Sequence, residues 1–210
     1  MKTPHESEID IMSNDPVLVD FVREFDSFLC LYKQLEAVKR TSLGEHLFKV
    51  GTQIKGGKKF WTKTDLNAIM QWKRLQPLQR RIEQGSAQLE QQLRFALMAD
   101  KEDRVGALCR IPGFGPVLAC AVLTLTWPET YGILDNTSWH ALGFLGFDLP
   151  PKAYSGGGFT VAEAEQYQHI IRTLGRITSA SPVHVADALH AFYKTRNRTR
   201  NSRRDRIAAA

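Results

Sequence analysis

The stretch Ile111-Pro112-Gly113-Phe114-Gly115-Pro116 joins two segments with helical spacing, and it decides the fold. Two glycines bracket Phe114, and glycine permits a positive φ or a close backbone approach to another molecule. Pro116 suits the first position of the helix that follows, where unpaired N–H groups and the positive end of the helix dipole can bind a phosphate. We therefore predict a tight hairpin between two helices whose backbone can bind a phosphate. The same pattern also fits a plain turn between two core helices.

A single carboxylate follows this hairpin. Asp135 lies twenty residues after Gly115, at the end of an apolar run. An ionised carboxylate beside C1′ of a deoxyribose would oppose the positive charge that builds on the sugar as a base leaves, and it could orient the attacking water. At about 4 Å and an effective dielectric near 20 this attraction is roughly 4 kcal/mol, or about a thousandfold in rate. The alternative is that Asp135 only caps a helix around Ser138 to Phe144, which is worth about 1 kcal/mol.

The rest of the chain is rich in helix signals. The residues that indicate helix starts are Asp15-Pro16, Thr64, Ser86, Asp100 with Asp103, Thr160 with Glu163, and Ser181-Pro182. The run from Val117 to Leu123 is apolar on all sides, which predicts the most buried helix. No alternating strand pattern exceeds four or five residues, so the predicted fold class is all-α.

We expect one helical domain over residues 1–194, with the helix-hairpin-helix unit at about residues 101–126. Apolar residues from Val17 to Leu35 recur at helical spacing and predict a long first helix, and the last helix is expected to end near Lys194. Two loops are expected, one rich in lysine from Lys49 to Lys63 and one rich in proline and glycine from Pro150 to Gly158.

Composition excludes several classes of protein. No apolar run approaches the roughly 20 residues that span a bilayer, and the polar N-terminus is unlike a secretory signal. The three cysteines, Cys30, Cys109 and Cys120, are scattered, so they offer neither a disulfide framework nor a metal knuckle. Because an iron–sulfur cluster of the usual kind needs four cysteines, none is expected. We expect a cytoplasmic protein that acts as a monomer without a required cofactor.

Positive charge is concentrated at the C-terminus. The chain has a net charge of +6, and residues 194–206 hold seven basic residues against the single Asp205. We predict that residues 195–210 form a flexible basic tail in which Arg196, Arg198 and Arg200 neutralise DNA phosphates. The alternative is a solvated tail that only aids solubility.

The string Ala107 to Pro116, continued by Ile133 to Trp139, resembles the helix-hairpin-helix DNA glycosylases, which carry a Gly/Pro-rich hairpin followed by an essential aspartate. The branch that excises 8-oxoguanine is the most similar, through Ala107-Leu108-Cys109 before the hairpin and Asp135 and Trp139 after it. The resemblance implies two helical subdomains around a cleft. It also implies binding of double-stranded DNA and excision of a base that is flipped out of the duplex.

This chain departs from the family at its catalytic lysine. The resemblance places that lysine at Gly106 or at Pro116 and Val117, and none of these is a lysine. The implied activity is therefore a monofunctional DNA glycosylase, which removes a damaged or modified base with water and does not cut the strand. Lys73 is a candidate for an amine nucleophile at a different position. The alternative is that Lys73 is a solvated lysine without a catalytic role. Repair and defence against phage DNA are both open as biological roles.

The resemblance also implies the remaining site residues. DNA-backbone contacts are expected from residues 112–117, which are Pro112, Gly113, Phe114, Gly115, Pro116 and Val117. A monovalent cation, K⁺ or Na⁺, is expected on the backbone carbonyls of Cys109, Ile111 and Phe114. Candidates for the base pocket or cleft are Trp72, Lys73, Trp127, Tyr131, Trp139 and His140, each with core packing or a solvated surface position as the alternative.

Two functions other than excision are compatible with the sequence. One is a helix-hairpin-helix protein that binds DNA without catalysis. The other is a protein-interaction domain whose hairpin does not bind DNA. Such a domain would show no salt-dependent DNA affinity.

Overall fold

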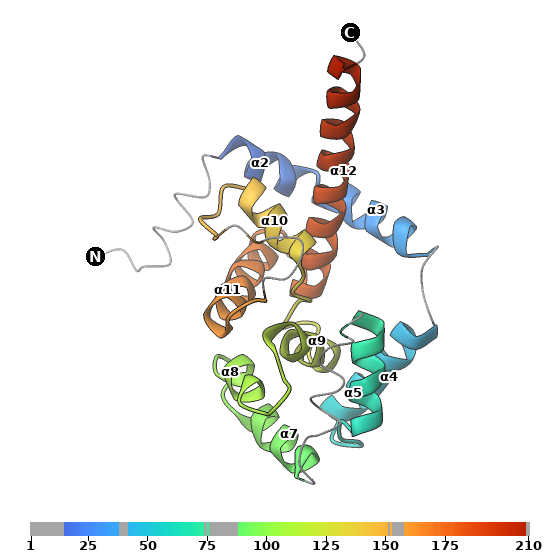
Figure 1. The fold of residues 1–210 in the computed structure, drawn as a ribbon, viewed down its shortest axis with the longest axis vertical. Helices are drawn as coiled ribbons and strands as arrows, with labels where there is room; N and C mark the ends of the chain where they lie inside the picture. The colour runs from blue at the N-terminus through green and yellow to red at the C-terminus, as the bar shows by residue number, and fades with distance from the viewer. Residues whose placement is uncertain are drawn as a thin grey trace, which may run out of the picture.

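Helix α9 (Pro116–Thr126) lies near the middle of the molecule (Figure 1), and every residue from Leu118 to Thr126 is buried. Its two threonines are tolerated there because their hydroxyls donate to carbonyls of the same helix, Thr124 to Cys120 at 2.7 Å and Thr126 to Val122 at 2.8 Å. The prediction that this apolar run forms a buried helix beginning at Pro116 is confirmed.

The computed structural model describes residues 15–37, 42–73, 75, 88–150, 152 and 158–208. Within these ranges the regular structure is entirely helical, which confirms the all-α class. The helices are α2 (Pro16–Arg23), α3 (Phe25–Ala37), α4 (Ser42–Lys55), α5 (Lys63–Lys73), α7 (Leu89–Met98), α8 (Arg104–Cys109), α9, α10 (Asn136–Phe144), α11 (Val161–Ile177) and α12 (Pro182–Ala208). None of the helices in the described ranges is long and apolar enough to cross a membrane.

The helices pack in two groups (Figure 1). Helices α3, α10 and α11 pack against α12, while α4, α5 and α8 pack against α9 and α7 packs against α8. Helix α11 also contacts α8 and α9, so it joins the two groups. The hairpin connects α8 to α9 in one group, and Asp135 begins α10 in the other.

Capping residues set several helix starts as predicted. Asp15 accepts from the amides of Val17 and Leu18 at the start of α2, and Thr160 with Glu163 forms a complete capping box at α11. The cap predicted at Thr64 is wrong. Asp65 and Thr62 instead exchange hydrogen bonds at the start of α5, with Thr62 N–H donating to Asp65 at 3.0 Å. The start predicted at Ser86 lies outside the described residues.

Three element boundaries differ from the prediction. The long first helix is divided at Glu24 into α2 and α3. The loop predicted from Lys49 to Lys63 begins later, because α4 extends to Lys55 with Leu47 and Val50 buried on its inner face. Helix α12 does not end near Lys194 but continues to Ala208. Residues 195–208 contain no proline or glycine that would stop it.

Candidate functional site

The segment that leads to Asp135 is held by two side chains of α11. Gln168 accepts from the N–H of Gly132 at 3.0 Å and donates to its carbonyl at 2.7 Å, and the hydroxyl of Tyr167 donates to the carbonyl of Ile133 at 2.9 Å. Both side chains are buried. Because consecutive peptide groups are fixed to one helix, the position of the next residues relative to α11 is fixed too.

Asp135 stands at the N-terminus of α10 as its N-cap. Its Oδ1 accepts from the Ser138 amide at 2.8 Å and from the Ser138 hydroxyl at 3.0 Å. The side chain nevertheless keeps 32% of its surface exposed. Asp135 therefore caps the helix, as the structural alternative predicted, and also presents a carboxylate to solvent.

The second oxygen of Asp135 faces α12. His190 Nδ1 lies 3.7 Å from Asp135 Oδ2, which is longer than an ordinary hydrogen bond. The loss of hydration that comes with burial would by itself raise the pKa of Asp135. The facing His190 imidazole, the charge of Lys73 and the Ser138 amide outweigh it and hold the pKa well below its ordinary value of 3.8. Asp135 is thus ionised at neutral pH.

The hydroxyl of Tyr167 and the thiols of Cys109 and Cys120 stay protonated at neutral pH. Burial, together with the charge of Asp135, raises the pKa of the Tyr167 hydroxyl well above its ordinary value of 10. Burial raises the pKa of Cys109 to about 11 and that of Cys120 to about 12, and Glu165 adds to both shifts. Neither thiol is a thiolate at neutral pH, so nucleophilic chemistry by these cysteines is not favoured.

The hairpin has an anchored interior and an open backbone. Gly113 has a φ of +90°, which favours glycine, and the Phe114 amide donates to the Ile111 carbonyl at 3.0 Å. Ile111 and Phe114 are both buried, as expected for residues that pin the turn. Gly115 is the N-cap of α9, and a Cβ added there would meet no atom within 4 Å. The backbone at the start of α9 is therefore open to close approach by another molecule.

The cation site on the hairpin stays a prediction. Of its three carbonyls, that of Ile111 already accepts one hydrogen bond, from Phe114. Among the residues that the structure describes, no three or more His, Cys, Asp or Glu side chains are grouped to hold a metal ion. The cation site predicted on the hairpin uses backbone carbonyls, so the absence of such a side-chain group does not test it.

Two base-pocket candidates are corrected by their burial. Trp139 is 1% exposed, its ring lies 5.2 Å from that of Phe159, and its indole N–H donates to the Pro150 carbonyl at 3.0 Å. Tyr131 is also 1% exposed, and its hydroxyl donates to the Lys101 carbonyl at 2.7 Å. Since core packing covers both rings, neither offers a face on which a base could stack.

The other candidates lie in different places. Trp127 stacks under the guanidinium of Arg104 at 4.2 Å, and half-buried His140 stacks on Tyr193 at 5.9 Å.

Half-buried Trp72 packs edge to face against Phe48 at 6.5 Å, and Lys73 follows it at the end of α5. Of the six candidates, the charge of Lys73 is the one that acts on Asp135.

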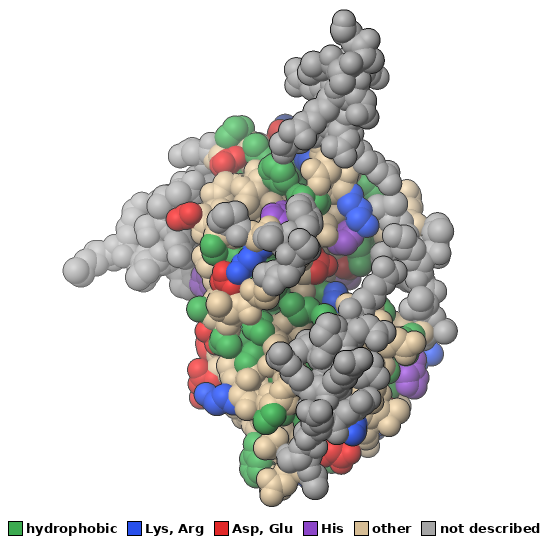
Figure 2. Space-filling view, in the orientation of Figure 1, with side chains coloured by type: hydrophobic (Ala, Val, Ile, Leu, Met, Phe, Trp, Pro, Cys, Tyr) green, Lys and Arg blue, Asp and Glu red, His purple; other side chains and the backbone are tan. Residues whose placement is uncertain are grey.

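The described part of the C-terminal basic segment includes Arg196. Its guanidinium lies 5.5 Å from the ring of Phe192, and it borders a small cavity together with Asp20 and Glu24. The side chains of Arg198 and Arg200 lie outside the described residues, although their backbone belongs to α12. Figure 2 shows basic and acidic side chains interspersed over the coloured residues of one face.

Comparison with known proteins identifies no relative: no protein-family model, no curated protein and no solved structure matches this chain.

His190, Ser138, Tyr167 and Gln168 are the site residues that the sequence did not predict. Ser138 could have been found, because a serine three residues after an N-cap is a local pattern. The other three come from α11 and α12, and only folding brings them beside the Asp135 segment.

Proposed function

We propose that this protein is a monofunctional DNA glycosylase of the helix-hairpin-helix type, which hydrolyses the bond between a damaged or modified base and deoxyribose. The observation that carries the proposal is Asp135, a carboxylate kept ionised yet one-third exposed at the start of α10. Asp135 would stabilise the positive charge that develops on the sugar. Its Oδ1 is held by Ser138, so Oδ2, which lies 3.7 Å from His190 Nδ1, is the oxygen that would face a substrate.

The hairpin supports the same proposal. Its backbone at Gly115 is open, and α9 starts there with Pro116 at its first position. A phosphate placed at this helix start would meet unpaired N–H groups and the positive end of the helix dipole. The DNA strand would thus be held by main-chain atoms, and basic residues of α12 would add charge neutralisation.

No lysine occupies the positions where the family carries its amine, which favours hydrolysis by water over a covalent sugar adduct. Lys73 is the remaining amine to test, because its charge acts on Asp135. Borohydride treatment with abasic DNA would trap a covalent adduct if Lys73 formed one. We expect none.

The test is a panel of duplexes that each contain one altered base, scored for abasic-site release with and without alkali. The wild type should release one or more bases and leave strands that break only after alkali. Asp135→Asn should excise about a thousandfold more slowly. Asparagine caps a helix about as well as aspartate, so the variant should still fold, but it should melt at a lower temperature than wild type because the folded state favours the charge that is lost.

The rival proposal is a helix-hairpin-helix protein that binds DNA without excision, and it is favoured by the capping role of Asp135. It predicts salt-dependent binding to DNA with no base release from any duplex. Excision by Asp135→Asn at the wild-type rate would exclude Asp135 as the catalytic carboxylate.

A further inference from the structure

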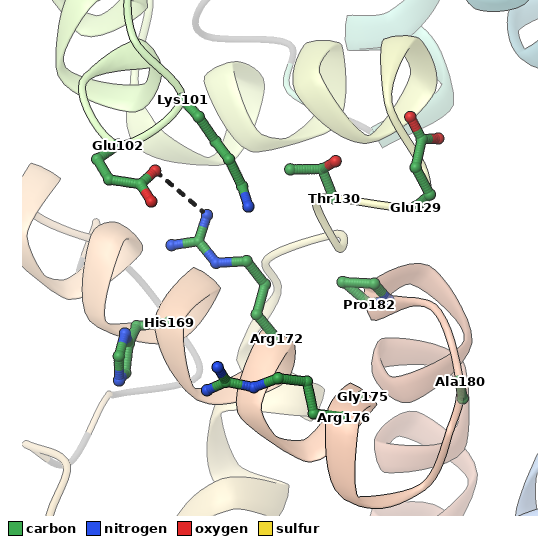
Figure 3. A pocket seen from close by; sticks show the side chains of 10 residues that line it. All are labelled: Lys101, Glu102, Glu129, Thr130, His169, Arg172, Gly175, Arg176, Ala180 and Pro182. Atoms are coloured by element: carbon green, nitrogen blue, oxygen red, sulfur yellow. Dashed lines mark ion pairs between the residues drawn. The ribbon is translucent and has the colours of Figure 1, made fainter. Parts of the chain in front are cut away.

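A cavity that Asp135 does not line lies between the segment before α8, the connection after α9, the end of α11 and the start of α12. Its volume is about 360 Å³, within the usual range of small-molecule sites. In Figure 3 the side chains of Lys101 and Arg172 extend toward the same space, and Arg176 follows one turn later on α11. The Tyr131 hydroxyl donates to the backbone carbonyl of Lys101 and does not use the Lys101 ammonium.

The cationic side chains of this cavity outweigh its acids. Glu129 is engaged by Lys55, whose ammonium lies 2.6 Å from it. Glu102 is 71% exposed and lies 3.8 Å from the Arg172 guanidinium, an ion pair that is long and solvated. Such an exposed pair contributes little to stability. An anion of higher charge density than Glu102 would therefore bind Arg172 more strongly than Glu102 does.

A further cation lies behind the cavity wall. The Arg104 guanidinium stacks on Trp127, and its Nε donates to the Ala99 carbonyl at 3.0 Å. The charges of Arg104 and Arg172 both act on the buried Tyr131 hydroxyl. The first residue of α12, Pro182, also lines the cavity, so the positive end of that helix dipole borders it.

We propose that this cavity binds a phosphate group, held by the guanidinium of Arg172 and the ammonium of Lys101. A guanidinium fork binds two phosphate oxygens at once, and an ammonium adds a point charge on the third side. The cavity is distinct from the hairpin site, since the two lie beyond opposite ends of α9, an eleven-residue helix of about 16 Å. The proposal does not depend on glycosylase activity.

The test is titration of the full chain with sodium phosphate at low salt, followed by the amide NMR shifts of Lys101, Thr130 and Arg172. The wild type should show saturable binding. Arg172→Ala and Lys101→Gln should each weaken it tenfold or more, and Glu102→Gln should tighten it severalfold. Lys101 is exposed, so Lys101→Gln tests the site even if Arg172→Ala folds poorly. Arg23→Ala removes the same charge from α2 and is the matched control.

Absence of saturable binding would overturn the proposal, as would equal affinities in the wild type, Arg172→Ala and Lys101→Gln. Competition identifies the source of the phosphate: displacement by adenosine monophosphate indicates a small ligand, and displacement only by an unmodified duplex indicates a DNA strand. The titration is repeated with Asp135→Asn, which should bind phosphate as the wild type does. A failure of this site is thereby separated from a failure of the proposed excision.

Discussion

The two oxygens of Asp135 have different surroundings, and this difference determines what the residue can do. Oδ1 accepts two hydrogen bonds from Ser138, while Oδ2 faces the imidazole of His190 at 3.7 Å. The capping bonds fix the direction of the carboxylate, and the His190 imidazole, the charge of Lys73 and the Ser138 amide keep it ionised. One side chain therefore combines a structural role with a charge that remains accessible.

His190 is expected to control the titration of Asp135. Replacing it in His190→Gln removes one of the groups that lower the pKa of Asp135, so that pKa should rise toward its ordinary value of 3.8. The carboxyl ¹³C shift of Asp135, followed from pH 7 into acid, measures the change. His46→Gln, on the exposed face of α4, is the control and should leave the titration unchanged. An unchanged midpoint in His190→Gln would mean that Lys73 and the Ser138 amide are enough to keep the pKa of Asp135 low.

At the scale of an element, the start of α5 depends on an ionised and buried acid. Asp65 accepts from the amide and hydroxyl of Thr62 at 3.0 and 2.7 Å and pairs with Lys59 at 3.2 Å. Burial opposes ionisation, but these bonds lower the pKa of Asp65 below its ordinary value. Its charge therefore stabilises the fold at neutral pH.

Asp65→Asn is expected to reduce the free energy of unfolding by about 1–3 kcal/mol at pH 7. Because the pKa of Asp65 is lowered by folding, its contribution is complete above the ordinary value of 3.8. It is lost as the pH falls through the folded-state pKa. The gap in urea midpoint between wild type and Asp65→Asn should shrink below about pH 4. Exposed Asp148, changed to Asn, should cause no comparable loss.

The hairpin allows a test that separates stability from DNA contact. Gly115 has a φ of −102° and open space where a Cβ would lie, so Gly115→Ala should cost no more than about 1 kcal/mol of stability. Under the proposed function the added methyl group would separate a phosphate from the α9 amides. We expect at least a tenfold loss of duplex affinity, measured by fluorescence anisotropy.

Gly143→Ala is the matched control for the hairpin variant. Gly143 lies in α10, and a Cβ there would also meet nothing within 4 Å. Alanine should stabilise this helix by up to about 1 kcal/mol and leave DNA affinity unchanged. Equal affinity of Gly115→Ala and wild type would argue against a backbone grip at the hairpin.

At the scale of the whole molecule, glycines determine how closely segments approach. A Cβ on Gly51 would lie 1.9 Å from the Leu125 carbonyl oxygen of α9, so α4 packs against α9 with no room for a side chain. Gly132 is similarly enclosed, with Ile171 of α11 at 2.5 Å and the Pro182 carbonyl at 2.7 Å. These contacts fix the position of α9 and of the connection that leads to Asp135.

Gly51→Ala should destabilise the protein by about 1–3 kcal/mol or more, because backbone must move to admit the methyl group. Gly56→Ala, at the end of the same helix, meets only ordinary contacts from 3.5 Å and should change stability little. Urea denaturation of both variants measures the difference. Similar midpoints for Gly51→Ala and wild type would mean that α4 can shift away from α9 without cost.

Local signals were enough to predict most elements. Pro116 and the apolar run after it predicted α9, and Thr160 with Glu163 predicted the start of α11, because capping and helical periodicity involve residues close in sequence. Helix α4 was missed because its lysines obscured the apolar spacing of Leu47 and Val50. The base-pocket candidates were wrong for Tyr131 and Trp139, since an aromatic residue has the same pattern in a core and in a cleft.

The sequence by itself determined the all-helical class, the hairpin with its glycines, and the capping position of Asp135, all of which depend on interactions within a few residues. Only the tertiary structure decided that His190 of α12 faces Asp135, that Tyr167 and Gln168 hold the preceding backbone, and that Lys101 and Arg172 share a cavity. The physical reason is that charge, burial and pKa depend on distances in space. Those distances are set by how helices far apart in the chain pack together.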